Sequence, residues 1–336
     1  MEFSGGIPLV DIFEEIGHAI AYNKDSDVLS DDILSGIIFG KDINIEAFSI
    51  KFEEAGYDIN GNNRMFMINI HSDNKIENFD YDFIMNEIYQ NLEHIIKNYS
   101  IGIDIDDNNI YLDTDGLIVS GTPYTQNTWM DVKYDGIPAT PRNGKPVEIN
   151  AMWYNALKVM VELAEYQKDE SKKEKYERMA NKCKKSFREK FYNKSKKCLY
   201  DVLEDGKVRP NQLFALSLSY PVLDVNSKEA KEMFETVTKK LLNKYGLKTL
   251  AKGEENYIDI YEGNGFKRDF SYHQGITWTW LLGLYYNCLK RFATESRTGK
   301  KKYNEQLEEF IQSVTETFSK EINERGCIGS IAEIYD

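Results

Sequence analysis

The stretch NTWMDVKYDGIPATPRNGKPVEINAMWYNALKVMVELAEYQK, residues 127 to 168, joins a loop of aromatic and polar side chains to an amphipathic helix. From Trp153 onward, Leu157, Met160 and Val161 recur at the spacing of one buried helix face. Asn150 stands where an N-cap is expected. The stretch therefore predicts a helix that starts near residue 150, directly after a loop in which prolines, an arginine and isolated carboxylates lie close together.

The same periodicity recurs along most of the chain, which indicates a mainly helical fold. We expect further helices over residues 81–100, 170–193, 210–219, 227–245, 275–293 and 303–322. An alternating pattern around residues 106–109 predicts a short hairpin between the first two helices. Its aspartates lack the glycine and the glutamate of an EF-hand loop, so we interpret it as a solvated turn. Residues 1–75 mix helical and strand-like signals, and we place a soft domain boundary near residue 75.

The composition excludes several classes of function. The 336 residues carry a formal net charge of -13, which disfavours nucleic acid and anionic membranes as partners. Aromatic residues make up 13% of the chain, a content that suits a surface stacking on flat ligands such as sugars. The sequence shows no metal-ligand set, no glycine-rich phosphate loop and no sign of a cofactor.

The compartment is predicted from the cysteines and the N-terminus. No pair among the four cysteines has the C-x-x-C spacing, so we expect free thiols in a reducing environment; they are Cys183, Cys198, Cys288 and Cys327. Glu2 stands where a secretory signal carries basic residues, and no apolar run has the roughly 20 residues that span a bilayer. We therefore expect a cytoplasmic protein, while its oligomeric state stays open.

Four strings carry a resemblance to a known family: TWMD, ATPRNGKPVEINAMWYNAL, YHQGITWTWLLG and GSIAEIYD. In this order and at these separations they resemble the glucosidase domain of glycogen debranching enzymes of the archaeal and bacterial type. The resemblance covers roughly residues 76–336. It implies an all-α fold, the (α/α)6 barrel, and hydrolysis of α-1,6-linked glucose at the branch points of glycogen.

The resemblance also implies a catalytic pair of carboxylates, with Asp131 as general acid and Glu333 as the base that activates water. Inverting glycoside hydrolases hold two such groups about 6.5 to 9.5 Å apart. Trp129 and Met130 precede the acid, and we expect them to form an apolar wall that favours its protonated form. Glu333 lies far along the sequence and is brought opposite Asp131 when the barrel closes.

Seven further residues are candidates for binding the sugar. His273 and Gln274 resemble the site-lining pair of the family, although a histidine at this place also suits a cap for the helix expected from residue 275. The other candidates are Trp129 and Trp278 for stacking on glucose, Glu148 for a hydroxyl or a helix cap, and Arg142 and Lys145 for hydroxyls or for holding the loop. Trp153 and Trp280 lie on helical stripes, and we expect both in the core.

Three functions remain open from the sequence. A barrel of twelve helices needs roughly 360 residues, so residues 1–75 would have to complete what residues 76–336 begin. The chain is then an active α-1,6-glucosidase, or a glycan-binding relative with an incomplete site and no catalysis. A third reading is a glucoamylase-like enzyme acting on α-1,4-linked ends, because the two carboxylates would serve either linkage.

Overall fold

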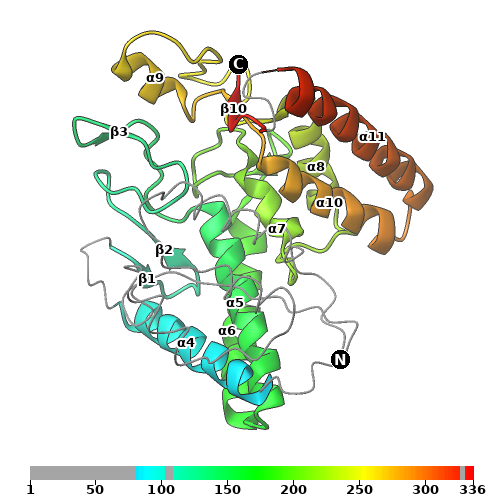
Figure 1. Ribbon diagram of the computed structural model, residues 1–336. Coiled ribbons are helices and arrows are strands. Elements are labelled where there is room, and N and C mark those ends of the chain that lie inside the picture. The colour runs from blue at the N-terminus through cyan, green and yellow to red at the C-terminus, as the bar shows by residue number, and fades with distance from the viewer. Residues whose placement is uncertain (1–80, 103–108, 326–329) are drawn as a thin grey trace, which may run out of the picture. The chain divides into compact units, whose positions relative to one another are not determined.

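The computed structural model describes residues 81–102, 109–325 and 330–336 (Figure 1). The chain divides into two compact units, Met1–Ile95 and Ile96–Asp336. The boundary expected near residue 75 lies outside the described residues. Because all the residues proposed for the site belong to the second unit, the fold of that unit is what positions them.

Helices make up about half of the described residues. The described ranges hold eight α-helices and one short 3-10 helix: α4 (Tyr81–Ile101), α5 (Val147–Tyr166), α6 (Glu170–Lys190), η1 (Pro210–Leu213), α7 (Phe214–Ser217), α8 (Lys228–Lys240), α9 (Gly265–Ser271), α10 (Leu281–Glu295) and α11 (Lys300–Glu324). None of these helices is both long and apolar enough to cross a membrane.

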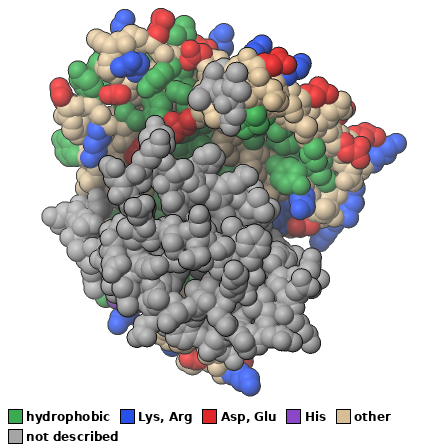
Figure 2. Space-filling model, viewed as in Figure 1, with side chains coloured by type: hydrophobic (Ala, Val, Ile, Leu, Met, Phe, Trp, Pro, Cys, Tyr) green, Lys and Arg blue, Asp and Glu red, His purple; other side chains and the backbone are tan. Residues whose placement is uncertain are grey.

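Two helical hairpins organise the second unit. Helix α5 packs along α6, α10 packs along α11, and the short α7 contacts both α5 and α10 (Figure 1). Acidic and basic side chains alternate on the visible surface of α11 (Figure 2). The helical class is thus confirmed for the described residues, whereas the closed (α/α)6 barrel stays a prediction.

The sequence explains where α6 forms and which face it buries. The side chain of Asp169 accepts a hydrogen bond from the backbone N–H of Lys172 at 3.0 Å and so caps the first turn. Tyr176, Cys183 and Phe187 form the buried seam expected from their spacing. The many lysines between them lie on the outer face, as the amphipathic pattern predicts.

Several expected helix ends are wrong. Helix α5 begins at Val147, with Pro146 in the N-cap position. Asn150 lies inside the helix, where its side chain accepts from the backbone N–H of Ile118 at 2.7 Å and donates to the carbonyl of Ile118 at 3.1 Å. The helix expected to reach residue 245 ends at Lys240, and the one expected from residue 275 begins at residue 281. Residues 192–193, 242–243 and 277–278, which were expected to be helical, form strands instead.

A small antiparallel sheet has the strand order β10-β9-β8-β7. The strands are β7 (Leu242–Asn243), β8 (Gly246–Lys248), β9 (Thr277–Trp278) and β10 (Ile334–Tyr335). Trp278 is opposite Leu247 on one side and Ile334 on the other. The pairing of β9 with β10 therefore carries the last residues of the chain to the segment around residue 275.

Three two-stranded hairpins complete the described fold. They are β1 (Tyr111–Leu112) with β2 (Ile118–Val119), β3 (Lys133–Tyr134) with β4 (Ile137–Pro138), and β5 (Tyr192–Asn193) with β6 (Cys198–Leu199). The turn of the first hairpin lies at residues 113–116, whereas residues 106–108, about which a hairpin was predicted, lie outside the described residues. Gly116 has a φ of 85°, a left-handed conformation that glycine adopts at little cost.

Candidate active site

Trp129 stands at the centre of a cluster of rings. Its ring meets those of His273, Trp278 and Trp280 edge to face, with centroids 5.2, 5.4 and 5.0 Å away. Trp129 is half-buried and Trp278 is buried. The expectation that Trp280 is in the core is wrong: its side chain is 38% exposed, because it precedes α10 instead of lying on the buried face of that helix. Trp153 is buried as expected.

A buried ionic network lies beneath this cluster. The Arg142 guanidinium donates to both carboxylate oxygens of Glu148, and its Nε donates to Asp201 at 2.7 Å. All three side chains are buried. Burial alone would lower the pKa of Arg142, but the charges of Asp201 and Glu148 outweigh it and raise that pKa. Arg142 and Glu148 therefore satisfy each other within the protein interior.

The network reaches Trp129 through one amide. The Asn211 side chain donates to Asp201 at 2.8 Å and accepts from the indole N–H of Trp129 at 2.7 Å. Because a carboxylate is an acceptor only, Asp201 fixes which end of the Asn211 amide points to the indole. The chain of contacts from Glu148 through Arg142 and Asp201 thus orients the tryptophan two residues before Asp131.

Arg209 connects the predicted pair His273 and Gln274 to the same buried interior. Its guanidinium donates to the carbonyl of His273 at 2.6 Å and to the side-chain oxygen of Gln274 at 2.7 Å. The Gln274 amide in turn donates to the carbonyl of Ala139 at 3.0 Å. Gln274 is buried, so its side chain joins the loop after Asp131 to the segment before β9.

His273 is buried with neither ring nitrogen bonded to any described group. Its ring stacks on Trp278 at 5.2 Å and packs against Tyr272. Burial, helped by the charges of Arg209 and Arg142, lowers the pKa of His273 to about 3. The imidazole is therefore neutral at ordinary pH, with one donor and one acceptor left without partners. Orphaned polar atoms of this kind are rare in protein interiors.

Tyr272 interacts with the two predicted catalytic carboxylates in different ways. Its hydroxyl donates to Glu333 at 2.6 Å. Burial raises the pKa of Tyr272, and the hydrogen bond to Glu333 and the negative charge of Asp131 raise it further. Asp131 is exposed, because the chain turns outward into β3 directly after the buried Met130, so the expected apolar wall does not surround its carboxylate.

Glu333 owes its place to the small sheet. The backbone N–H of Thr279 donates to the Glu333 carbonyl at 3.3 Å, and the Thr279 hydroxyl donates to the carbonyl of Ala332 at 3.2 Å. The rings of Tyr245 and Tyr335 stack at 4.2 Å and fix the strand on its other side. The Glu333 side chain itself is exposed.

Lys145 lies apart from this group. Its ammonium donates to Asp113 at 2.6 Å and to Asp115 at 2.7 Å, the aspartates of the β1–β2 turn. The lysine thus holds the loop before α5 against the hairpin. The ammonium of Lys145 compensates the charge of these two carboxylates. No group of three possible metal ligands occurs among the described residues.

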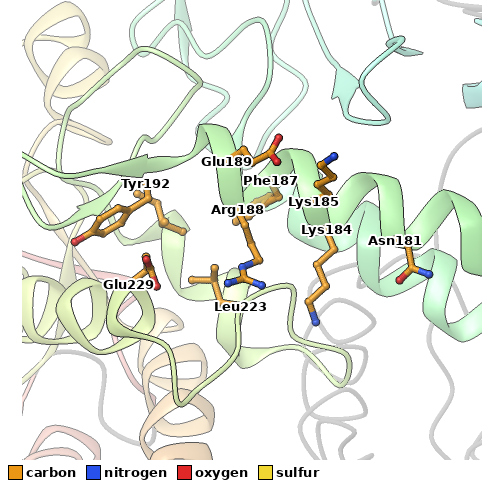
Figure 3. Close-up of a pocket in the computed structure, with 10 residues that line it drawn as sticks. Asn181, Lys184, Lys185, Phe187, Arg188, Glu189, Tyr192, Leu223 and Glu229 are labelled. Atoms are coloured by element: carbon orange, nitrogen blue, oxygen red, sulfur yellow. The ribbon is translucent and has the colours of Figure 1, made fainter.

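Two hollows of the described surface lie away from the predicted site. One of about 460 Å³ lies beside the C-terminal half of α6, where Lys184 and Arg188 point toward the loop bearing Leu223 (Figure 3). A second of about 390 Å³ adjoins it and shares Lys184 and Leu223. None of the predicted site residues lines either hollow.

Four residues of this arrangement were not predicted: Asp201, Arg209, Asn211 and Tyr272. The run RPNQ at residues 209–212 places polar side chains immediately before an apolar helix, and all of these side chains are buried. That run was the available signal for the network. Tyr272 directly precedes the predicted pair His273 and Gln274, so its neighbourhood was known but its role as a partner of Glu333 was not.

The chain is similar to several known proteins. Over 249 residues it is 25% identical to a glycogen debranching enzyme from Saccharomyces cerevisiae. This match covers 60% of this chain and 16% of the yeast protein. A sialidase structure superposes with a TM-score of 0.47 at 16% identity, over 69% of this chain and 20% of that one, and is too distant to inform the fold. A family model described as amylo-alpha-1,6-glucosidase matches residues 53–336. The chain therefore belongs to the amylo-alpha-1,6-glucosidase family.

Proposed function

We propose that this protein hydrolyses α-1,6-linked glucose at the branch points of glycogen or a similar branched α-glucan. Family membership supports a glycoside hydrolase, and the yeast relative, whose name refers to glycogen, supports the substrate. The chain corresponds to only 16% of that relative, so the linkage and the substrate are proposals for this chain. Three buried free thiols, Cys183, Cys198 and Cys288, support our proposal that it works in the reducing cytoplasm.

One observation carries the catalytic assignment. The hydroxyl of Tyr272 donates a hydrogen bond to Glu333 at 2.6 Å, and the negative charge of Asp131 contributes to the raised pKa of Tyr272. Asp131 and Glu333 come from distant parts of the sequence, and we propose that they flank one site. Two carboxyl groups flanking one site are what glycoside hydrolysis requires.

The buried side of the same place suits the terminal glucose. His273 offers a neutral ring with one donor and one acceptor unused, and Trp129 and Trp278 supply flat apolar faces beside it. A sugar hydroxyl can accept from the ring N–H of an imidazole, and another can donate to its second nitrogen. We assign His273 to hydroxyl binding, and Trp129 and Trp278 to packing against the ring of the glucose.

In the proposed reaction, the Asp131 carboxyl donates its proton to the glycosidic oxygen as the bond from that oxygen to C1 breaks. Water adds its oxygen to C1 from the opposite face and gives one proton to the Glu333 carboxylate. Glucose leaves with inverted anomeric configuration, and the two carboxyl groups then exchange a proton with solvent to begin again. Arg142, Glu148 and Gln274 serve by holding Trp129 and the segment around residue 273 in place.

The test is release of free glucose from a branched limit dextrin. We expect Asp131→Asn and Glu333→Gln each to lower kcat about 10³-fold, the usual contribution of a general acid or base. Asp135→Asn is the matched control, because Asp135 lies in the exposed turn between β3 and β4 and has a φ of 49°, which asparagine adopts readily. It should behave like the parent.

Product analysis separates the readings that the sequence left open. Glucose of the β-configuration appearing first, by proton NMR, would support inversion from an α-linked substrate. A faster reaction with maltose than with isomaltose would favour the glucoamylase-like function. Folded parent protein that binds limit dextrin yet releases no glucose would refute the hydrolase and leave glycan binding.

A further inference from the structure

Two exposed aromatic rings lie on elements that adjoin the proposed catalytic segments along the chain. Tyr134 in β3 is 37% exposed and Phe266 in α9 is 45% exposed. Their ring centroids are 5.0 Å apart, and the ring planes meet at 80°. Perpendicular rings form an open corner, in which the face of at least one ring stays available to a ligand.

The two elements that carry these rings lie next to each other. Helix α9 contacts β3, and both project on the same side of the second unit (Figure 1). Figure 2 shows hydrophobic side chains at the surface on this side. Exposed apolar side chains that gather on a charged surface commonly mark a binding site.

Each element is directly continuous with one part of the proposed catalytic centre. Strand β3 begins two residues after Asp131, and α9 ends at Ser271, next to the tyrosine that donates to Glu333. His273 and Trp278 are buried, whereas Tyr134 and Phe266 are exposed. A polymer whose last glucose packs against His273 and Trp278 would continue over these exposed rings.

We propose that Tyr134 and Phe266 form a binding platform for the part of the α-glucan that stays behind after cleavage, on the leaving-group side of the scissile bond. The inference rests on the proposed function and extends it from the reacting glucose to the sugars beyond it. The ring faces pack against the apolar faces of glucose units, and the open surface admits a long chain. Asp131 lies at this side, which agrees with its proposed role of protonating the leaving oxygen.

The experiment compares two substrates that differ in the leaving group. Limit dextrin places glucose units on the platform, whereas α-D-glucosyl fluoride leaves as fluoride and cannot reach it. For the double variant Tyr134→Ala, Phe266→Ala we expect the ratio of kcat/KM for limit dextrin to kcat/KM for the fluoride to fall about tenfold. Tyr134→Phe keeps the ring and should keep the ratio within about twofold.

Tyr111→Ala is the matched control, since Tyr111 is 39% exposed on the separate β1–β2 hairpin. It should leave both activities unchanged. A double variant with the parent's ratio, whether both activities are kept or both fall equally, would overturn the platform. An unchanged ratio is also the result expected of a surface that contacts another protein.

A failure of the proposed function is recognised separately. If the parent hydrolyses neither substrate, calorimetric titration with limit dextrin tests the platform alone. Binding that weakens about tenfold in the double variant but not in Tyr111→Ala would support it. Absent binding in the parent, or equal binding in the parent and the double variant, would refute it.

Discussion

At the scale of single residues, Tyr272 positions the proposed base. Burial and the bond to Glu333 raise the pKa of Tyr272, so its hydroxyl remains a donor throughout the working pH range. For Tyr272→Phe we expect kcat to fall about tenfold with little change in KM, because the carboxylate loses the group that holds it.

The matched control for this prediction is Tyr257→Phe. Tyr257 makes the same kind of bond, to Asp259 at 2.8 Å, without contacting Glu333. Its removal should leave kcat unchanged. A Tyr272→Phe enzyme with the parent's kcat would show that the bond to Glu333 has no part in catalysis.

His273 should make the protein sensitive to mild acid. Its folded pKa of about 3 lies below the ordinary value near 6.5, so between these values the unfolded chain binds a proton that the folded protein does not. Stability is therefore complete above about pH 6.5 and declines as the pH falls toward 3. From pH 7 to pH 5 this histidine should cost about 2 kcal/mol of the free energy of unfolding.

Urea denaturation at both pH values measures this cost. His273→Phe keeps a ring of similar size that does not titrate, and every other titrating group is common to parent and variant. The loss of stability from pH 7 to pH 5 should be smaller in the variant by about 2 kcal/mol. Equal losses in the two proteins would mean that His273 is protonated in the folded state.

The residues also show how far a sequence leads toward a site. Trp129, His273 and Trp278 lie in the strings that resemble the family, so the sequence points to them as site residues. The partners of Arg142 and Glu148 do not, because a buried ion pair depends on Asp201, which no spacing connects to them. Types of residue were predictable at the site, and the contacts between them were not.

At the scale of elements, the long helices were predictable and the short strands were not. A helix such as α6 repeats its apolar spacing over several turns, whereas strands of two or three residues show no period. Strand β9 was expected to be helical because its residues continue into the apolar pattern of α10. Its partners β8 and β10 are distant in sequence, and tertiary pairing decides such cases.

Gly246 tests the importance of this sheet. A Cβ at Gly246 would lie 2.2 Å from the carbonyl oxygen of Trp278, so the backbones of β8 and β9 approach too closely for any side chain. We expect Gly246→Ala to lower the free energy of unfolding by about 3 kcal/mol. It should also impair glucose release, because β9 carries the strand that places Glu333.

Gly283→Ala is the control for that change. Gly283 lies exposed in α10, and no atom stands within 4 Å of the Cβ it would gain. Alanine should therefore stabilise the helix by about 0.5 to 1 kcal/mol. Chemical denaturation of both variants gives the comparison, and a Gly246→Ala protein as stable as the parent would contradict the close approach of the strands.

At the scale of the whole unit, the buried network joins segments that are far apart in the sequence. Arg142 connects the loop before α5 to Asp201, and Arg209 connects the start of η1 to the carbonyls of Thr249 and His273. The proposed catalytic residues lie on the exposed edge of this assembly. We therefore propose that its interior fixes the site without touching the substrate.

This distinction between holding and binding is testable at Arg142. Arg142→Met leaves two buried carboxylates without their cation, and we expect it to lower the free energy of unfolding by about 4 kcal/mol, measured by urea denaturation. Arg142→Lys should recover little, because an ammonium cannot bridge Glu148 and Asp201 in the geometry of a guanidinium. Lys145→Met, which breaks a partly exposed pair, should cost about 1 kcal/mol or less. If Arg142→Met instead kept the parent's stability and raised only KM, Arg142 would be a substrate ligand.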